Sequence, residues 1–411
     1  MSVTKYYKKM LLFLSVMGPG IVTAFADNDA GGIATYASVG AQYGYQLLFV
    51  LFISTISLGI FQEISARTGA VTGRGLAALI REYYGVRWTF LAIVILLFAN
   101  IATTVSEFSG IASSFEVFSI SKYVIVPFSA VLIWWIVLKY NYRSVEKVFF
   151  CLCFMFISYV ITGVIVEPDW QAAGSALVIP DFSNNYEYIL LAVGLVGTTI
   201  TPWGQFYIQS SVVDKGIRAE KYRYLLVDVL VGTLLTGVIA FFIIIVTAAA
   251  LYGQHFVIAN VHDVAIALEP LAGSYAKTLF AFGLLGASML AAVVLPLSTA
   301  YAICEAMGFE HGIDKTYREA PAFFILYTFL IVIGAGLVLM PGISLYKVML
   351  AAQVINGVLL PPILIFMLLL VNNKELMGKY KNGRIYNYIA WMFTVFLVLL
   401  NLILLIAGFI E

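Results

Sequence analysis

The sequence predicts an all-α integral membrane protein with eleven transmembrane helices, arranged as two inverted sets of five helices and one additional helix. Three observations lead to this fold class. The chain is 62% hydrophobic and only 11% charged, whereas soluble proteins carry roughly 25% charged residues. Eleven segments reach the length of about 20 apolar residues that a helix needs to cross a bilayer. Helix breakers interrupt the first and the sixth of these segments.

The predicted spans are apolar over most of their length. They are 10–42, 46–66, 89–119, 122–140, 147–167, 187–213, 224–252, 276–305, 321–340, 346–371 and 385–410. Paired interrupted helices at matching positions in two halves indicate a transporter site near the bilayer midplane. We therefore expect a single transmembrane domain, 1–411, in which the repeats cover about 10–167 and 187–371 and the helix 385–410 is extra.

The distribution of basic residues predicts the orientation. One side of the membrane receives most of the lysines and arginines, whereas the other side has only Lys122, Lys277 and Lys347. Because cytoplasmic loops are enriched in Lys and Arg, we expect a cytoplasmic N-terminus and, after an odd number of spans, Glu411 outside the cell. We expect the chain in the plasma membrane, surrounded by lipid, as a monomer. The net charge of +1 gives no sign of a nucleic-acid partner.

The first span carries side chains that a purely lipid-spanning helix does not need. In GPGIVTAFADNDAGGIAT, Asp27, Asn28 and Asp29 lie at membrane depth, directly before two glycines. Charge at this depth is costly and therefore indicates a functional site. Opened backbone would add carbonyl oxygens where protein or a cavity surrounds it. Such hard oxygen ligands suit Mg²⁺, Mn²⁺ or Ca²⁺, and the alternative is a polar turn between two short helices.

The sixth span contains a comparable interruption in TTITPWGQFYIQSS. Pro202 removes a helix hydrogen bond and frees carbonyl groups near Thr198 and Thr201. Gln205 and Gln209 are four residues apart and share one helix face. Proline kinks are common in membrane helices, so the position opposite a broken first span is what favours a site here.

Two further spans carry polar side chains at depth. Glu107 in the third span could relay protons or attract cations, and the alternative is a carboxyl group that a structural partner satisfies. Gln353 and Asn356 in the tenth span are three residues apart and place two amides on one face. Hydrogen bonding between helices is the ordinary explanation for such a pair.

Motifs of enzymes and ATP-driven pumps are missing from the sequence. It contains no P-loop, no GxSxG and no HExxH, so neither catalysis nor ATP-driven transport within this chain is expected. A membrane enzyme or receptor subunit would also need a catalytic constellation or a soluble module. We expect no cofactor, because a bound metal ion would be the substrate.

These residues resemble the Nramp family of divalent-metal transporters, along nearly the whole chain. The run from Asp29 to Gly32, followed by Ile33, Ala34 and Thr35, looks like the family's first-helix DPGN motif and its tail. Further similar positions are Gly44–Leu48, Gln62–Arg67, Glu107, Thr201–Trp203 with Ser210 and Ser211, Gln353, and Met377 with Gly378. The resemblance implies a LeuT-type inverted repeat and uptake of divalent metal, commonly together with protons.

The departures from the family pattern are specific. Gly32 stands where the family has a metal-binding asparagine, Thr201 where it has a methionine ligand, and Trp203 where it has a histidine tied to proton movement. Asp29 is retained. Soft sulfur favours transition metals and oxygen favours hard ions, and Mg²⁺ tends to keep several waters. A site widened in this way resembles the Nramp-related magnesium transporter branch.

We therefore predict a secondary transporter that moves Mg²⁺, and also Mn²⁺, by alternating access, with a largely hydrated ion and weak or absent proton coupling. The predicted metal site comprises Asp29, Ala26, Gly32, Thr198, Thr201 and Gln353, and the secondary residues are Asp27, Asn28, Glu107, Trp203, Gln205, Gln209 and Asn356. The alternatives are a proton-coupled Mn²⁺ or Fe²⁺ importer of ordinary Nramp type, a sodium-coupled amino-acid transporter of the same fold, and a channel.

Overall fold

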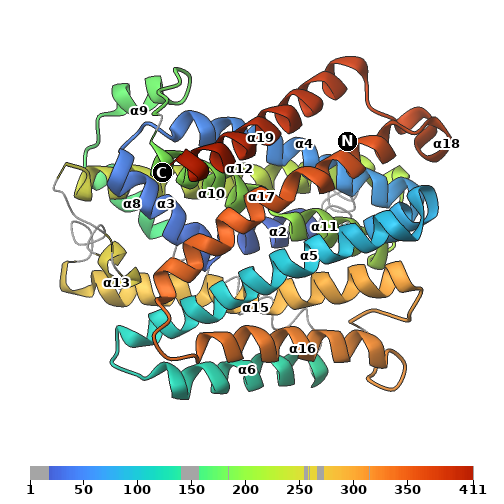
Figure 1. Ribbon diagram of the computed structural model, residues 1–411, viewed down its shortest axis with the longest axis horizontal. Coiled ribbons are helices and arrows are strands. Elements are labelled where there is room, and N and C mark those ends of the chain that lie inside the picture. Colours follow the sequence, from blue (N-terminus) through green and yellow to red (C-terminus); the bar gives the residue numbers. More distant parts are fainter. Residues whose placement is uncertain are drawn as a thin grey trace, which may run out of the picture.

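All regular structure in the described residues is helical (Figure 1). The computed structural model describes residues 18–139, 157–183, 185–253, 258, 260–265, 273–313 and 315–410. Its α-helices are α2 (Pro19–Asp27), α3 (Ala30–Tyr43), α4 (Leu48–Thr72), α5 (Leu76–Glu116), α6 (Lys122–Lys139), α8 (Ile157–Ile165), α9 (Trp170–Ala176), α10 (Tyr186–Thr199), α11 (Pro202–Asp214), α12 (Tyr222–Leu251), α13 (Val261–Val264), α15 (Ala276–Met307), α16 (Pro321–Val338), α17 (Leu345–Asn372), α18 (Lys374–Met377) and α19 (Arg384–Ile410).

The lengths of these helices confirm a multi-span membrane protein. Across the described ranges, nine helical segments are long and apolar enough to cross a membrane. The first predicted span consists of α2 and α3, each too short to be counted separately. The fifth predicted span, 147–167, lies partly outside the described residues, as do the residues of the first span before Gly18. The total of eleven spans therefore stays a prediction.

Two helices are longer than their predicted spans. Helix α5 begins at Leu76 rather than at 89, and a non-helical glycine, Gly85 with φ 79°, kinks it. Helix α4 continues beyond the predicted end at 66 to Thr72. Within it Arg67 and Glu63, one turn apart, form an ion pair of 2.8 Å. A span predicted from apolar residues alone ends at the first charged residues, although the helix itself continues when those charges are paired.

Small residues allow the helices around the centre to approach closely. Helix α5 packs against α15, α16 and α17 (Figure 1). A Cβ atom on Gly197 of α10 would overlap the carbonyl of Gln353 and the backbone of Gly357 in α17. Small residues at such crossings are typical of helix packing in membranes. This contact holds Gln353 next to the interrupted part of the fold.

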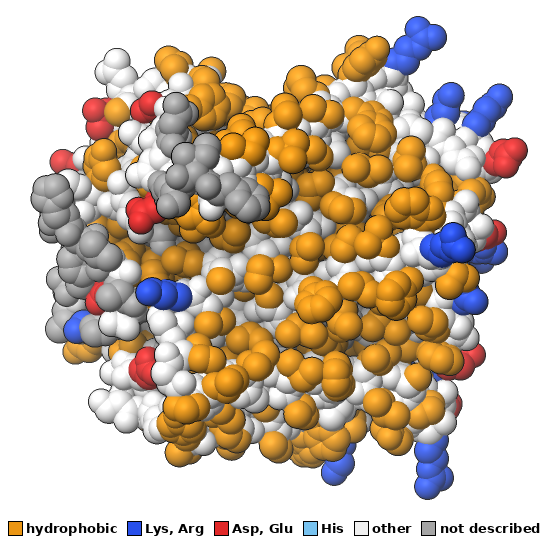
Figure 2. Space-filling view, viewed as in Figure 1, with side chains coloured by type: hydrophobic (Ala, Val, Ile, Leu, Met, Phe, Trp, Pro, Cys, Tyr) orange, Lys and Arg blue, Asp and Glu red, His pale blue; other side chains and the backbone are white. Residues whose placement is uncertain are grey.

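The surface has the polarity that a bilayer requires. Figure 2 shows apolar side chains across the broad face, whereas charged side chains gather toward the two opposite ends. Lys and Arg concentrate at the end where Figure 1 places α18. An apolar belt between charged ends is what membrane insertion demands, because lipid cannot solvate charge.

Both predicted helix interruptions are present and share one local design. Helix α2 ends at Asp27, and α3 begins after Asp29, which is extended with φ −75° and ψ −178°. Helix α10 ends at Thr199, and α11 begins after Thr201, with φ −81° and ψ 141°. Each N-cap side chain accepts a hydrogen bond from the amide three residues later, which satisfies a helix-end donor. The two predicted interruptions are thus confirmed.

Candidate cation site

The carboxylate of Asp29 is held between the break and α17. Its Oδ1 accepts a hydrogen bond of 2.6 Å from the amide of Gly32. The Nε2 atom of Gln353 donates to Oδ1 at 3.1 Å and to Oδ2 at 3.3 Å. Asp29 and Gln353 are both fully buried. The structure thus brings together two residues that are 324 positions apart in the chain.

The amide of Gln353 faces Asp29 with its nitrogen, not with its oxygen. Its Oε1 accepts a hydrogen bond of 3.0 Å from Nδ2 of Asn356, and the same Nδ2 donates at 2.9 Å to Oγ1 of Thr103. Gln353, predicted as part of the metal site, therefore turns its donor group toward the carboxylate in this conformation. In this conformation Gln353 orients the carboxylate, and Asn356 and Thr103 orient Gln353.

Glu107 lies on the other side of Asp29. Its Oε2 accepts a hydrogen bond of 3.2 Å from the amide of Ala30, the first residue of α3. Its Oε1 has no partner among the described residues. Glu107 and Asp29 both accept hydrogen bonds from amides in the first turn of α3. Two carboxylates this close repel each other, so a proton or a cation between them stabilises the pair.

Asp27 has a separate set of neighbours. Its Oδ1 accepts a hydrogen bond of 2.9 Å from Oγ1 of Thr201, and its Oδ2 accepts one of 3.1 Å from Nε2 of Gln62. Thr201, predicted as part of the metal site with Asp29, binds Asp27 through its hydroxyl. Gln62 was not predicted as a site residue, although an amide within an apolar span was a usable signal.

Oxygen atoms converge at Gly32. A Cβ atom there would lie 2.8 Å from Oγ1 of Thr198, 3.2 Å from Oδ1 of Asp29 and 3.3 Å from the carbonyl oxygen of Asp27. The hydroxyl of Thr198 has no hydrogen-bond partner among the described residues. The wide cavity that we expected at Gly32 is therefore closed in this conformation, and a hydrated ion would need the helices to separate.

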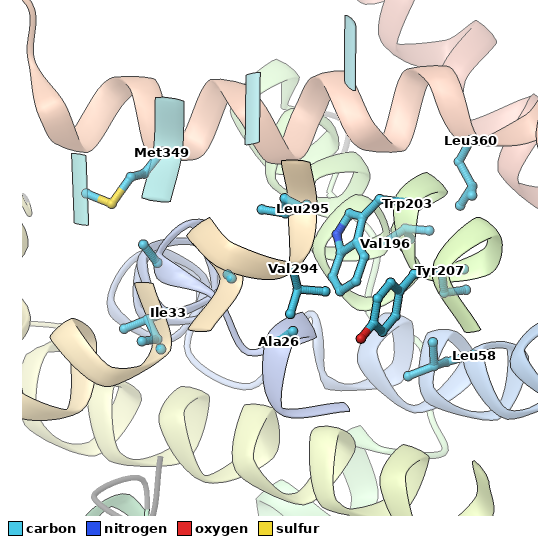
Figure 3. Packing of buried hydrophobic residues seen from close by; sticks show 14 of the residues in the cluster. Ala26, Ile33, Leu58, Val196, Trp203, Tyr207, Val294, Leu295, Met349 and Leu360 are labelled. Carbon is cyan, nitrogen blue, oxygen red and sulfur yellow. The ribbon is translucent and has the colours of Figure 1, made fainter. Parts of the chain in front are cut away.

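No described hydrogen bond joins the side chains of the remaining predicted residues to Asp29. Ala26 and Trp203 are fully buried in the apolar core, where the Trp203 ring lies near Val294 and Tyr207 (Figure 3). Asn28 donates to the carbonyl of Ala24 at 3.2 Å.

Two predicted glutamines point toward α4. Gln205 accepts a hydrogen bond of 3.4 Å from Ser65, and Gln209 donates at 2.9 Å to the carbonyl of Arg74. No described hydrogen bond joins either of them to Asp29. Gln209 therefore lies at the C-terminal end of α4, away from the carboxylates.

Two residues near the site were missed from the sequence. The hydroxyl of Tyr36 lies 3.2 Å from Oγ1 of Thr199. Met349 is fully buried and projects from α17 one helical turn before Gln353 (Figure 3). In the sequence neither residue differs from other apolar or aromatic core residues. Only the rotation of α3 and α17 places them near the site.

The site is negative and has no basic counterpart. Asp27, Asp29 and Glu107 are all fully buried, and within the described part of the chain none of them forms an ion pair. An uncompensated buried charge is costly. The C-terminal ends of α2 and α10, which favour cations, meet the N-terminal ends of α3 and α11 at these breaks. The arrangement can therefore bind a positive ion through hard oxygen atoms.

The fold and this buried acidic site define a membrane transporter built from two inverted repeats around broken helices. Residues 20–407 match the family described as natural resistance-associated macrophage protein-like, or Nramp. The chain belongs to this family. It is consequently a metal transporter and not an enzyme.

Similar proteins support the assignment. The divalent metal cation transporter MntH of Klebsiella pneumoniae subsp. pneumoniae is 27% identical over 398 residues, which are 94% of this chain and 93% of that protein. A crystal structure of the Eremococcus coleocola manganese transporter has a TM-score of 0.79 at 21% identity and covers 97% of this chain and 87% of that chain. MhsT in complex with L-phenylalanine has a TM-score of 0.61 at 14% identity, covering 95% and 97% of the two chains. These two structural likenesses show the shared fold.

Proposed function

We propose that this protein moves Mg²⁺, and also Mn²⁺, across the membrane by alternating access, with Asp29 as the main anionic ligand. The observation that carries the proposal is the convergence of oxygen atoms at Gly32 beside a buried carboxylate with no basic partner. The similarity of this chain to a divalent metal cation transporter and to a manganese transporter agrees with a divalent cation as the substrate.

The ligand chemistry favours a hard ion. The polar groups next to Asp29 and Asp27 are hydroxyl, amide, carbonyl and carboxyl groups. Oxygen ligands suit Mg²⁺ and Mn²⁺, whereas thioether ligands favour softer metals. The thioether of Met349 lies a turn away on α17, so we assign it to the apolar core. Because Mg²⁺ dehydrates reluctantly, we infer that it enters an opened form of the site with most of its water.

Weak or absent proton coupling is part of the proposal. Helix α16, which packs against α5, contains no Asp, Glu, Lys, Arg or His. In α5 no such residue lies between Arg87 and Glu107. A proton relay needs a series of ionisable groups, and neither α16 nor the part of α5 between Arg87 and Glu107 supplies one. The side chains next to this path are neutral, such as Thr103 and Asn356.

We also propose the plasma membrane as the location, with a cytoplasmic N-terminus. The concentration of Lys and Arg at the end near α18 supports this orientation (Figure 2), because basic residues favour the cytoplasmic side.

Uptake into proteoliposomes tests the proposed substrate and ligand. Asp29→Ala removes the carboxylate that caps α3 and serves as the proposed ligand. We therefore expect Mg²⁺ uptake to fall to background. Asp181→Ala makes the same chemical change at an exposed loop residue and serves as the matched control, with uptake close to that of the parent. Parental Mg²⁺ uptake by Asp29→Ala would show that the site assignment is wrong.

The same assay separates the competing functions. Strong Fe²⁺ or Cd²⁺ uptake without Mg²⁺ uptake, accompanied by proton entry, would identify an importer of ordinary Nramp type. Uptake of labelled amino acids driven by sodium would identify the other transporter class, which the buried carboxylates disfavour because they repel an amino-acid carboxylate. Single-channel currents would identify a channel.

A further inference from the structure

Asp27 is a buried carboxylate that the site around Asp29 does not use directly. We propose that Asp27, together with Thr201 and Gln62, forms a second binding position for the transported cation, which the ion occupies after leaving Asp29 on its way across the membrane. The inference rests on the proposed function and adds a second step to it.

The two carboxylates face different helices. Asp29 is bound by Gln353 of α17 and lies beside Glu107 of α5. Asp27 is bound by Thr201 of α11 and Gln62 of α4. Across the break between α2 and α3, each carboxylate therefore has its own set of polar neighbours.

The Asp27 neighbourhood has one unused oxygen ligand. Gln62 is fully buried, and its Oε1 has no hydrogen-bond partner among the described residues. Because its Nε2 already binds Asp27, the Oε1 atom of the same amide lies beside that carboxylate. A turn of this amide would present oxygen to a cation. One carboxylate with a hydroxyl and an amide oxygen is a ligand set for a hard ion.

Oxygen atoms lie at both positions, and Asp27 contributes one to each. Around Gly32 lie Oδ1 of Asp29, Oγ1 of Thr198 and the carbonyl oxygen of Asp27. At Gly204 of α11, a Cβ atom would lie 2.9 Å from Oγ1 of Thr201 and 3.5 Å from Oδ1 of Asp27. Once the helices separate, a cation that moves between the carboxylates would have oxygen neighbours at both positions.

Electrostatics makes the two positions alternatives for one ion. Asp27 lies at the C-terminal end of α2, where the helix dipole favours a cation, whereas Asp29 caps the N-terminal end of α3. Two dications at such neighbouring residues would repel strongly. In the predicted orientation α11 and the part of α4 around Gln62 lead toward the cytoplasm, so the ion would reach Asp27 second.

Binding and transport can be measured separately to test this. Isothermal titration of the purified full chain with Mg²⁺ reports binding, and Mg²⁺ flux into liposomes reports translocation. For Asp27→Asn we expect a Kd within about threefold of the parent and a maximal rate lower by about tenfold or more, because the first binding position is intact. Asp29→Asn should lose the binding heat itself. Gln62→Leu keeps both carboxylates and should lower the maximal rate with little change in Kd.

Several outcomes would overturn the proposal. If Asp27→Asn loses binding as Asp29→Asn does, the two residues share one site. If Asp27→Asn transports at the parental rate, Asp27 takes no part. Asp27 has a purely structural role if Asp27→Asn transports slowly, its thermal unfolding temperature is also lowered, and Gln62→Leu transports normally. If instead Asp29→Asn binds and transports like the parent, the proposed function itself fails, whatever Asp27→Asn does.

Discussion

The carboxylate of Asp228 in α12 fixes the start of α2, and its neutralisation should release that half-helix. Its Oδ1 accepts a hydrogen bond of 3.1 Å from the amide of Gly18, and its Oδ2 accepts one of 2.7 Å from the amide of Gly20. The contact is tight, because a Cβ atom on Gly20 would lie 2.8 Å from the carbonyl oxygen of Asp228. The negative charge also interacts favourably with the N-terminal end of the helix.

The magnitude follows from these contacts. Asp228→Asn keeps one oxygen acceptor but loses the second one and the charge. A hydrogen bond to a charged group contributes about 1.5–3 kcal/mol, and a charge at a helix end contributes about 0.3–1 kcal/mol. We therefore expect α2 to be held less tightly by about 2 kcal/mol, which corresponds to a roughly 30-fold larger population with α2 displaced.

Cysteine labelling measures this population. Thr23 is fully buried in α2, and its Cγ2 faces Gly204 of α11, so a Thr23→Cys side chain reacts with a maleimide only when α2 moves away. In a background without the native cysteines, Asp228→Asn should accelerate labelling by about 10- to 30-fold. Asp169→Asn is the matched control, because Asp169 caps the exposed helix α9. An unchanged labelling rate in Asp228→Asn, or an equal increase in the control, would refute the reasoning.

Three further predictions concern the site and the inner end of α4. Thr201→Met places a thioether next to Asp27, so the ratio of Cd²⁺ to Mg²⁺ uptake in liposomes should rise by about tenfold; an unchanged ratio would contradict the hard-ligand argument. Asn356→Leu removes the donor to Oε1 of Gln353, so this oxygen can turn toward the ion. The KM for Mg²⁺ should then fall severalfold. A constant KM would mean that other contacts orient the Gln353 amide. Glu63→Gln leaves a buried arginine without its ion pair, and a loss of about 3–5 kcal/mol should lower the thermal unfolding temperature. The control is Glu82→Gln, which breaks the exposed ion pair with Arg74 and should lower stability by at most about 1 kcal/mol. Equal decreases of the unfolding temperature in the two variants would argue against burial as the cause.

The fold was largely predictable because lipid restricts what a spanning segment can be. Apolar length located the helices, and the breakers around Asp29 and Pro202 located the interruptions that the structure confirms. These are local properties of a helix in a bilayer, so they can be read without knowing the neighbours. Boundaries such as the start of α5 were missed where charged residues continue a helix beyond the apolar part.

The sequence by itself determined that a carboxylate lies at a broken helix in a membrane, and the residues from Asp29 to Thr35 indicated the family. Only the tertiary structure decided which partner each polar group meets. It paired Thr201 with Asp27, turned the nitrogen of Gln353 toward Asp29 and brought Asp228 to the start of α2. The physical reason is that these contacts depend on how each helix is rotated and how deeply it is inserted relative to helices far away in the chain. Packing of small residues such as Gly20 and Gly197 sets that rotation and depth.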